Sequence, residues 1–230
     1  KHGYIPVVVT TDPDDEAPRA GRPPVIDPGR PVAWSKFLAI QRHLPEYDYL
    51  AYIDMDAIIM DFNTPLEAFI EVSGPCSDVI LTEDWNGPNT GVYIVKNTPW
   101  SRWFVAHAWE LGLPLVSKRS PGGTKHPFEY EQRVVHYLLE SNIWKKRELS
   151  KYRRKDAHKL IRSHISVLPQ CAFNSYSMHP LDSRGLPNDV SRYMESINGK
   201  STDFLIHFAG KKGQIKTNLI EHYLTISERE

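Results

Sequence analysis

The sequence predicts an α/β fold built as one domain over residues 1–230. Apolar, β-prone runs alternate along the chain with stretches of helical spacing, which is the pattern of a sheet covered by helices. The length suits one domain with a sizeable core, and neither an internal repeat nor a second domain boundary interrupts the sequence. The apolar run from Tyr49 to Ile59 predicts a buried strand that ends in two carboxylates, Asp54 and Asp56.

The first half of the chain contains predicted strands and helices in alternation. Ile5 to Thr11 is rich in valine and predicts a strand. Asp12 to Val32 is dense in proline, glycine and charge, and predicts a long loop. Trp34 to Leu44 has helical spacing, and the strand that ends at Asp54 follows it. Thr64-Pro65 predicts the start of a short helix, because proline is favoured in a first helical turn.

The second half continues the alternation. We expect strands at Asp78–Thr82, Val92–Val95 and Phe204–Phe208, a turn at Asn86–Gly91, and helices at Trp100–Leu113, Glu129–Leu139 and Ile215–Ile226. The segment between the last two helices is less regular.

Charge and cysteine content narrow the function classes. The 28 basic and 28 acidic side chains cancel, which argues against a nucleic-acid-binding surface. A basic cluster at residues 145–155 is expected to be solvated surface. No apolar run approaches the roughly 20 residues of a transmembrane helix. Cys76 and Cys171 are the only two cysteines, too few for a disulfide scaffold.

The two carboxylates after the apolar run are the first candidate site. The carboxyl ends of strands are where open α/β sheets bind ligands. Buried, unpaired carboxylates are costly, so a cation is expected to meet Asp54 and Asp56. A divalent metal that carries phosphate oxygens fits this chemistry. The alternative is that both residues cap the following turn or pair with basic side chains at the surface.

Further polar residues gather at predicted strand ends and turns. They are Glu83 and Asp84 with Asn89, Thr90 and Gly91; Glu131 with Gln132; and His207 with Gly210, Lys211 and Lys212. His207 has the chemistry to complete a metal shell, and a lysine beside glycines that allow close backbone approach suits a diphosphate. The structural alternatives are a core histidine and a helix-capping glycine with basic neighbours.

Together these residues resemble the GT-A glycosyltransferases and, more specifically, glycosyltransferase family 34, which contains fungal α-galactosyl- and mannosyltransferases and plant xyloglucan xylosyltransferases. The segments that carry the resemblance follow the family's order along the chain. They are His2-Gly3-Tyr4, Pro31-Val32-Ala33-Trp34-Ser35-Lys36, Tyr52-Ile53-Asp54-Met55-Asp56-Ala57, Asp84-Trp85-Asn86-Gly87-Pro88-Asn89-Thr90-Gly91, Asn97-Thr98-Pro99-Trp100-Ser101, Glu131-Gln132 ahead of Tyr137-Leu138-Leu139, and His207-Phe208-Ala209-Gly210. Tyr130 departs from it, because the family often has Asp-Asp-Gln where this chain has Tyr130-Glu131-Gln132.

The resemblance implies a GT-A type, Rossmann-like domain with a mixed central sheet, in which the family's first βα unit is absent, so that the chain is expected to be part of a longer polypeptide. It implies a metal-dependent, retaining glycosyltransferase that moves a hexosyl or pentosyl unit from a nucleotide-diphosphate sugar to a hydroxyl group and forms an α-linkage. The expected donor is UDP-galactose or UDP-xylose, with GDP-mannose as the second choice. The expected acceptor is an oligosaccharide, a polysaccharide or a glycoprotein glycan. By the same resemblance, the expected location is the Golgi lumen, as a soluble catalytic fragment of a membrane-anchored protein.

The resemblance also assigns roles. Asp54, Asp56 and His207 would hold Mn²⁺, or else Mg²⁺. Glu131, Gln132 and Asp84 are the candidate catalytic residues; if the reaction has an enzyme nucleophile, Glu131 or Asp84 has the chemistry. Among the candidate substrate-binding residues, Trp34 would form an apolar wall near the nucleotide, with Ser35 and Lys36 as polar contacts beside it. Asn89, with Asp84 and Gln132, would contact the donor sugar, and Lys212, or else Lys211, would supply positive charge at the diphosphate. Thr90, Gly91 and Gly210 complete the candidate substrate-binding set.

Two other functions compete with this interpretation. Haloacid-dehalogenase-like phosphatases also carry Asp-x-Asp after an apolar strand, but there the pair normally lies on the first strand before a Gly-Thr-like turn, whereas Ala57-Ile58 follows here. The other alternative is a non-catalytic module that binds nucleotide-sugars. Turnover of a sugar donor or of a phosphomonoester would separate the three.

Overall fold

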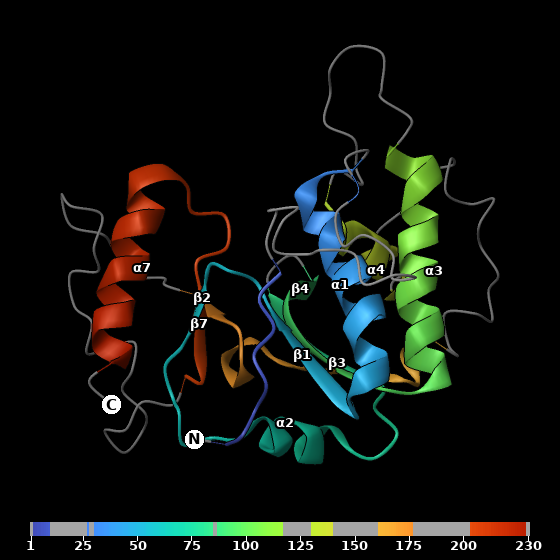
Figure 1. Cartoon of the computed structure of the whole chain (residues 1–230), viewed down its shortest axis with the longest axis horizontal. Coiled ribbons are helices and arrows are strands. Elements are labelled where there is room, and N and C mark those ends of the chain that lie inside the picture. The colour runs from blue at the N-terminus through green and yellow to red at the C-terminus, as the bar shows by residue number, and fades with distance from the viewer. Residues whose placement is uncertain are drawn as a thin grey trace, which may run out of the picture.

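Two mixed β-sheets form the frame of the protein (Figure 1). The computed structural model describes residues 2–9, 27, 30–84, 87–116, 130–139, 161–176 and 203–228. The larger sheet has the order β1 (Tyr49–Ile53), β4 (Gly87–Lys96), β3 (Val79–Asp84), β5 (Ile165–Pro169). Its β1-β4 and β4-β3 pairs are antiparallel, and its β3-β5 pair is parallel.

The smaller sheet continues directly from the larger one. It has the order β2 (Ala57–Ile59), β7 (Leu205–His207), β6 (Ser175–Tyr176), with β2-β7 antiparallel and β6-β7 parallel. Because β1 ends at Ile53 and β2 begins at Ala57, the chain crosses from one sheet to the other within three residues. The expectation of a mixed sheet is therefore confirmed, and the crossing carries the Asp-x-Asp pair.

Helices cover both faces of the larger sheet, because alternate residues of β3 and β4 are apolar on opposite faces. One face packs on α1 (Ser35–His43), α3 (Pro99–Val116) and α4 (Gln132–Leu139). The opposite face packs on α2 (Leu66–Ser73) and on residues next to the smaller sheet. The last helix, α7 (Gly213–Ser227), covers the smaller sheet through a separate apolar cluster, and Figure 1 shows it beside β2 and β7.

Most predicted elements are present within a few residues of their expected ends. Short 3-10 turns extend the first helix at Val32–Trp34 and Leu44–Glu46. Strands β5 and β6, with the 3-10 turn Gln170–Ala172 between them, were not predicted. Most of the predicted loop Asp12–Val32 lies outside the described residues.

Two predictions of local structure were wrong. Residues 2–9 form no strand; Tyr4 instead donates a 2.6 Å hydrogen bond to Glu67 Oε2 and accepts one from the Leu66 amide at the start of α2. The second is the turn expected at Asn86–Gly91: its described residues, from Gly87 onward, belong to β4. Pairing with β3 overrides the local preference of its glycine, proline and asparagine residues.

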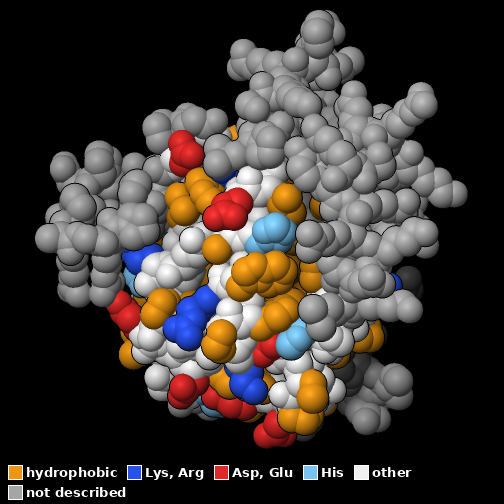
Figure 2. Space-filling model, turned by 90° about the vertical axis from the view of Figure 1, so that its right-hand side faces the viewer, with side chains coloured by type: hydrophobic (Ala, Val, Ile, Leu, Met, Phe, Trp, Pro, Cys, Tyr) orange, Lys and Arg blue, Asp and Glu red, His pale blue; other side chains and the backbone are white. Residues whose placement is uncertain are grey.

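The face of the molecule that carries α3 is mixed in charge. Figure 2, which shows the side of the molecule that carries α3, has acidic, basic and apolar side chains interspersed among its coloured residues. No helix within the described ranges is both long enough and apolar enough to span a bilayer.

Candidate active site

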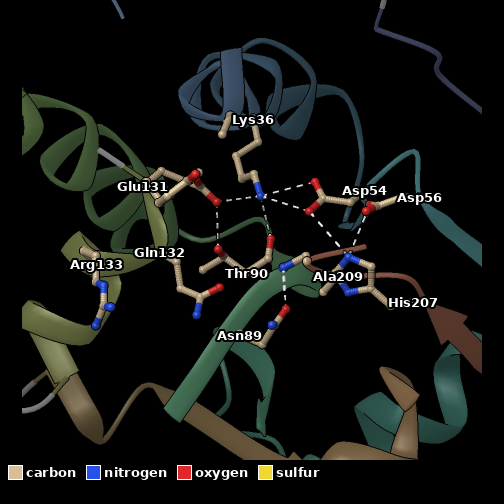
Figure 3. Close-up of a pocket in the computed structure, with 14 residues that line it drawn as sticks. Lys36, Asp54, Asp56, Asn89, Thr90, Glu131, Gln132, Arg133, His207 and Ala209 are labelled. Atoms are coloured by element: carbon tan, nitrogen blue, oxygen red, sulfur yellow. Dashed lines mark hydrogen bonds and ion pairs between the residues drawn. The ribbon is translucent and has the colours of Figure 1, made fainter. Parts of the chain in front are cut away.

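Three candidate metal ligands converge where the two sheets meet (Figure 3). Asp54 follows the last residue of β1, Asp56 lies in the turn before β2, and His207 ends β7. Antiparallel pairing of Ala57 with His207 brings the histidine beside the turn. His207 Nε2 lies 3.2 Å from Asp56 Oδ1 and 4.0 Å from Asp54 Oδ2. The three ligand atoms lie within 4.8 Å of one another, which suits one cation between them.

Neighbouring side chains hold each of these ligands through its other polar atom. Tyr52 donates a 2.9 Å hydrogen bond to Asp54 Oδ1. His207 Nδ1 donates to Asn174 Oδ1 at 2.9 Å, and the Asn174 amide donates in turn to Thr82. With Nδ1 engaged by Asn174, Nε2 is the ring nitrogen that faces the aspartates. This is the arrangement of a histidine that ligates a metal.

The two aspartates differ in electrostatics. Burial raises the pKa of Asp54 above its ordinary value, although the Lys36 ammonium opposes the rise. Burial also acts to raise the pKa of Asp56, but interactions with His207 and Lys216 outweigh it and hold the pKa below its ordinary value. Lys216 Nζ lies 2.6 Å from Asp56 Oδ2. Asp56 is therefore the more firmly ionised of the pair.

Lys36 joins the candidate metal site to the candidate catalytic carboxylate. Its ammonium lies 2.7 Å from Glu131 Oε1 and 3.2 Å from Asp54 Oδ1, and it donates to the Thr90 carbonyl at 2.9 Å. Burial acts to lower the pKa of Lys36, but the carboxylates of Glu131 and Asp54 outweigh it and raise the pKa. The Thr90 hydroxyl donates a further 2.9 Å hydrogen bond to Glu131 Oε1. Lys36 has three partners for its three donors.

A bulge in β4 places Thr90 and Gly91 at this centre. Leu81 pairs with Tyr93, but the next residue, Thr82, pairs with Asn89, so three residues of β4 bulge out of the ladder. The Gly91 carbonyl accepts from the Asp54 amide at 2.7 Å. A Cβ at Gly91 would lie 2.2 Å from His207 Cε1, so this position has no room for a side chain.

Asn89 begins a second polar group beside the bulge. Its Nδ2 donates to Asp84 Oδ2 at 3.0 Å and to the Tyr176 hydroxyl at 2.6 Å, and its Oδ1 accepts from the Gly91 amide at 2.7 Å. Tyr176 donates to the same Asp84 oxygen at 2.6 Å. Asp84 thus holds Asn89 in place, while Asn89 itself borders the cavity.

These residues enclose a cavity of about 340 Å³ (Figure 3). Its walls carry the candidate metal ligands and hydrogen-bonding groups from both sheets and from α1 and α4. The lining residues are Ala33, Lys36, Asp54, Asp56, Asn89, Thr90, Gly91, Tyr130, Glu131, Gln132, Arg133, His207, Ala209 and Gly210. The candidate metal ligands lie at one end and Gln132 and Arg133 at the other, so a ligand can contact a cation and α4 together.

Five predicted site residues do not line the cavity, and one of them, Asp84, contacts it only through Asn89. Trp34 is fully buried and packs against Phe37 and Trp109, so it offers no accessible wall to a nucleotide. Ser35, Lys211 and Lys212 do not line the cavity, although the two lysines lie just before α7 and close to Gly210, which does.

Sequence reasoning also missed several residues of the site. They are Tyr52, Arg133, Asn174, Tyr176 and Lys216. Strand alternation could have predicted that Tyr52 lies beside Asp54, because residues i and i+2 share a face of a strand. The positions of the others depend on long-range pairing.

Comparisons with known proteins identify a matching family, related sequences and a similar fold. Residues 68–216 match the sequence model of the galactosyl transferase GMA12/MNN10 family. The chain is 27% identical over 155 residues to an uncharacterized alpha-1,2-galactosyltransferase of Schizosaccharomyces pombe, a match covering 66% of this chain and 36% of that protein. It is 31% identical over 111 residues to galactomannan galactosyltransferase 1 of Cyamopsis tetragonoloba, covering 44% and 25%. It is 22% identical over 215 residues to the probable alpha-1,6-mannosyltransferase MNN10 of Saccharomyces cerevisiae, covering 82% and 48%.

These matches span between a quarter and a half of the length of the relatives. Among solved structures, a glycosyltransferase involved in the glycosylation of the major capsid of PBCV-1 superposes with a TM-score of 0.51 at 17% identity, covering 84% of this chain and 76% of that one. At this identity the likeness concerns the fold alone, and it confirms the expected glycosyltransferase-type α/β fold.

Proposed function

The chain belongs to the galactosyl transferase GMA12/MNN10 family, and we propose that it transfers a sugar from a nucleoside-diphosphate donor to a saccharide hydroxyl with the help of a divalent cation. The family membership confirms the resemblance drawn from the sequence. The observation that carries the proposal is the convergence of Asp54, Asp56 and His207 at one end of a polar cavity.

The donor set fits a hard divalent cation. Two carboxylate oxygens and one imidazole nitrogen lie close together, and each of these groups is fixed by a partner on its other atom. Mn²⁺ is the first choice and Mg²⁺ the second. A cation bound here would neutralise charge on the departing diphosphate. Asp54, Asp56 and His207 would hold it.

The remaining groups suit the donor. Asn89, Glu131 and Gln132 border the cavity beyond the candidate metal ligands, where a donor sugar attached to the diphosphate would lie. Lys211 and Lys212 precede α7, within the segment that carries Gly210, and supply positive charge for the diphosphate. Lys36 has its donors engaged by protein groups, so its role is to position Glu131 and Asp54.

The proposed reaction retains the anomeric configuration and forms an α-linkage. UDP-galactose or UDP-xylose is the first choice of donor and GDP-mannose the second, and the acceptor is a glycan. The names of the galactosyl- and mannosyltransferase relatives support hexose donors. Tyr130 lines the cavity where the family resemblance implies an acidic residue, so we expect it to alter the part of the pocket that faces the sugar.

The test is a screen of nucleotide-sugars for hydrolysis with Mn²⁺, with Mg²⁺ and with chelator, using the wild type and Asp54→Asn. We expect cation-dependent release of nucleoside diphosphate from one donor, and its loss in Asp54→Asn without loss of the folded circular-dichroism spectrum. Turnover of a phosphomonoester in place of every sugar donor would refute the transferase. With an acceptor in hand, the early NMR coupling of the product's anomeric proton decides retention, since a β-product from an α-donor shows inversion.

A further inference from the structure

Lys216 contacts the candidate metal ligand Asp56 from α7, a helix for which sequence reasoning predicted no part in the site. It lies in the first turn of α7, and its Nζ is 2.6 Å from Asp56 Oδ2. Apolar packing fixes the helix in this place, because Leu219 and Tyr223 are fully buried against Ile58 of β2 and its neighbours. The lysine therefore reaches Asp56 from a rigid support.

The two oxygens of Asp56 have different partners. Oδ2 pairs with Lys216, whereas Oδ1 lies 3.2 Å from His207 Nε2. A cation bound between Asp56 and His207 would take Oδ1 and leave the lysine contact on Oδ2 intact. Lys216 therefore holds Asp56 through the atom that faces away from the candidate metal site. Asn174 does the same for His207, and Tyr52 does the same for Asp54.

The turn that carries Asp56 is hydrogen-bonded through its backbone, whereas the described partners of the Asp56 carboxylate are Lys216 and His207. Met55, at its tip, is 89% exposed. The Asp56 backbone is tied by its carbonyl, which accepts from the Phe208 amide at 2.9 Å, but this bond leaves the side-chain torsions free. Without a partner on Oδ2, the carboxylate would rotate among its rotamers. Outer partners that orient a ligand typically change metal affinity about 10- to 100-fold when they are removed.

We propose that Lys216 is a positioning residue for the divalent cation: it fixes the Asp56 carboxylate so that Oδ1 faces His207. This inference rests on the proposed function, because it presumes that a cation binds at Asp54, Asp56 and His207. The opposing possibility is that the ammonium competes with the cation by charge. The two differ in sign, since loss of an orienting lysine weakens cation binding and loss of a competing one strengthens it.

The experiment measures Mn²⁺ binding by electron paramagnetic resonance, without nucleotide, to the wild type and three variants. Lys216→Met removes the charge and keeps the apolar stem. Lys216→Arg keeps a positive charge and hydrogen-bond donors. Lys96→Met is the matched control, because it removes one lysine at the far end of β4, where Nζ lies 3.5 Å from the Pro75 carbonyl.

We expect Lys216→Met to bind Mn²⁺ at least 10-fold more weakly, with Lys216→Arg and Lys96→Met within about threefold of the wild type. Unchanged or tighter binding by Lys216→Met, or equal weakening in Lys216→Arg, would overturn the inference. Helical circular dichroism verifies that α7 stays folded. If the wild type binds no divalent cation, this inference and the metal role both fail; if it binds one and Lys216→Met binds as well, the inference fails alone.

Discussion

Lys36→Met is the substitution for which the structure gives the sharpest expectation. The Lys36 side chain is 3% exposed and lies between Glu131 and Asp54. Methionine preserves the length and the apolar stem of the side chain but removes the ammonium. Two carboxylates then face each other without a cation, and the Thr90 carbonyl loses its 2.9 Å donor. We expect a large loss of stability.

The size of the expected stability loss depends on how deeply the partners of Lys36 are buried. Removing one partner of a buried ion pair typically costs about 3–5 kcal/mol, because the other charge stays buried without compensation. The Glu131 side chain is 5% exposed, so it meets this condition, whereas Asp54, at 29% exposed, is partly screened by water. We therefore expect Lys36→Met to lower the free energy of unfolding by about 3 kcal/mol, near the lower end of that range.

The assay is urea denaturation of the cation-free protein at pH 7, with a double-mutant cycle. Glu131→Gln removes the charge that Lys36→Met leaves unpaired, so the double variant should lose less stability than the two single losses together, with a coupling of about 1–3 kcal/mol. Lys96→Met serves as the surface control. A loss below about 1 kcal/mol in Lys36→Met, or strict additivity in the cycle, would refute the reasoning.

Three further predictions follow from the same geometry. Gly91→Ala should displace His207, because its Cβ would lie 2.2 Å from Cε1, and calorimetry should show Mn²⁺ affinity reduced by more than 10-fold, with about 1–3 kcal/mol of lost stability from overpacking. Because the pKa of Asp56 is held below its ordinary value, the ionised carboxylate stabilises the cation-free protein above about pH 4, and this stabilisation is lost as the pH falls further. The difference in free energy of unfolding between the wild type and Asp56→Asn should therefore shrink by about 1 kcal/mol or more between pH 5 and pH 3. Saturating Mn²⁺ should slow amide hydrogen exchange in β7 more than in α2, which contributes no candidate ligand, and equal slowing in both would contradict a local site.

The sequence was most informative where function follows from an unusual local composition. Asp54 and Asp56 interrupt an apolar stretch, and such an interruption needs a compensating partner whatever the tertiary structure. His207 ends a short apolar strand, so its place at a strand end was predicted before its neighbours were known. The alternation of strands with helices likewise gave the layered fold, because it reflects burial on both faces of β3 and β4.

Local composition was misleading where tertiary pairing decides the outcome. Gly87, Pro88 and Asn89 are typical of a turn, yet they pair with β3 up to a bulge. Trp34 suggested a stacking surface, but α3 covers it through Trp109. Asn174 could not be found from local sequence, because only the parallel pairing of β6 with β7 brings its neighbourhood beside His207.

The spacing of the Asp-x-Asp pair has a different origin from simple strand alternation. Asp54 is tied to the larger sheet, because its amide donates to Gly91 of β4 at 2.7 Å. Asp56 is tied to the smaller sheet, because its carbonyl accepts from Phe208, next to β7, at 2.9 Å. Met55 is the one residue between these two backbone hydrogen bonds, and its side chain faces solvent. With one residue between them, each sheet presents a carboxylate to the candidate metal site, so the crossing fixes the positions of Asp54 and Asp56.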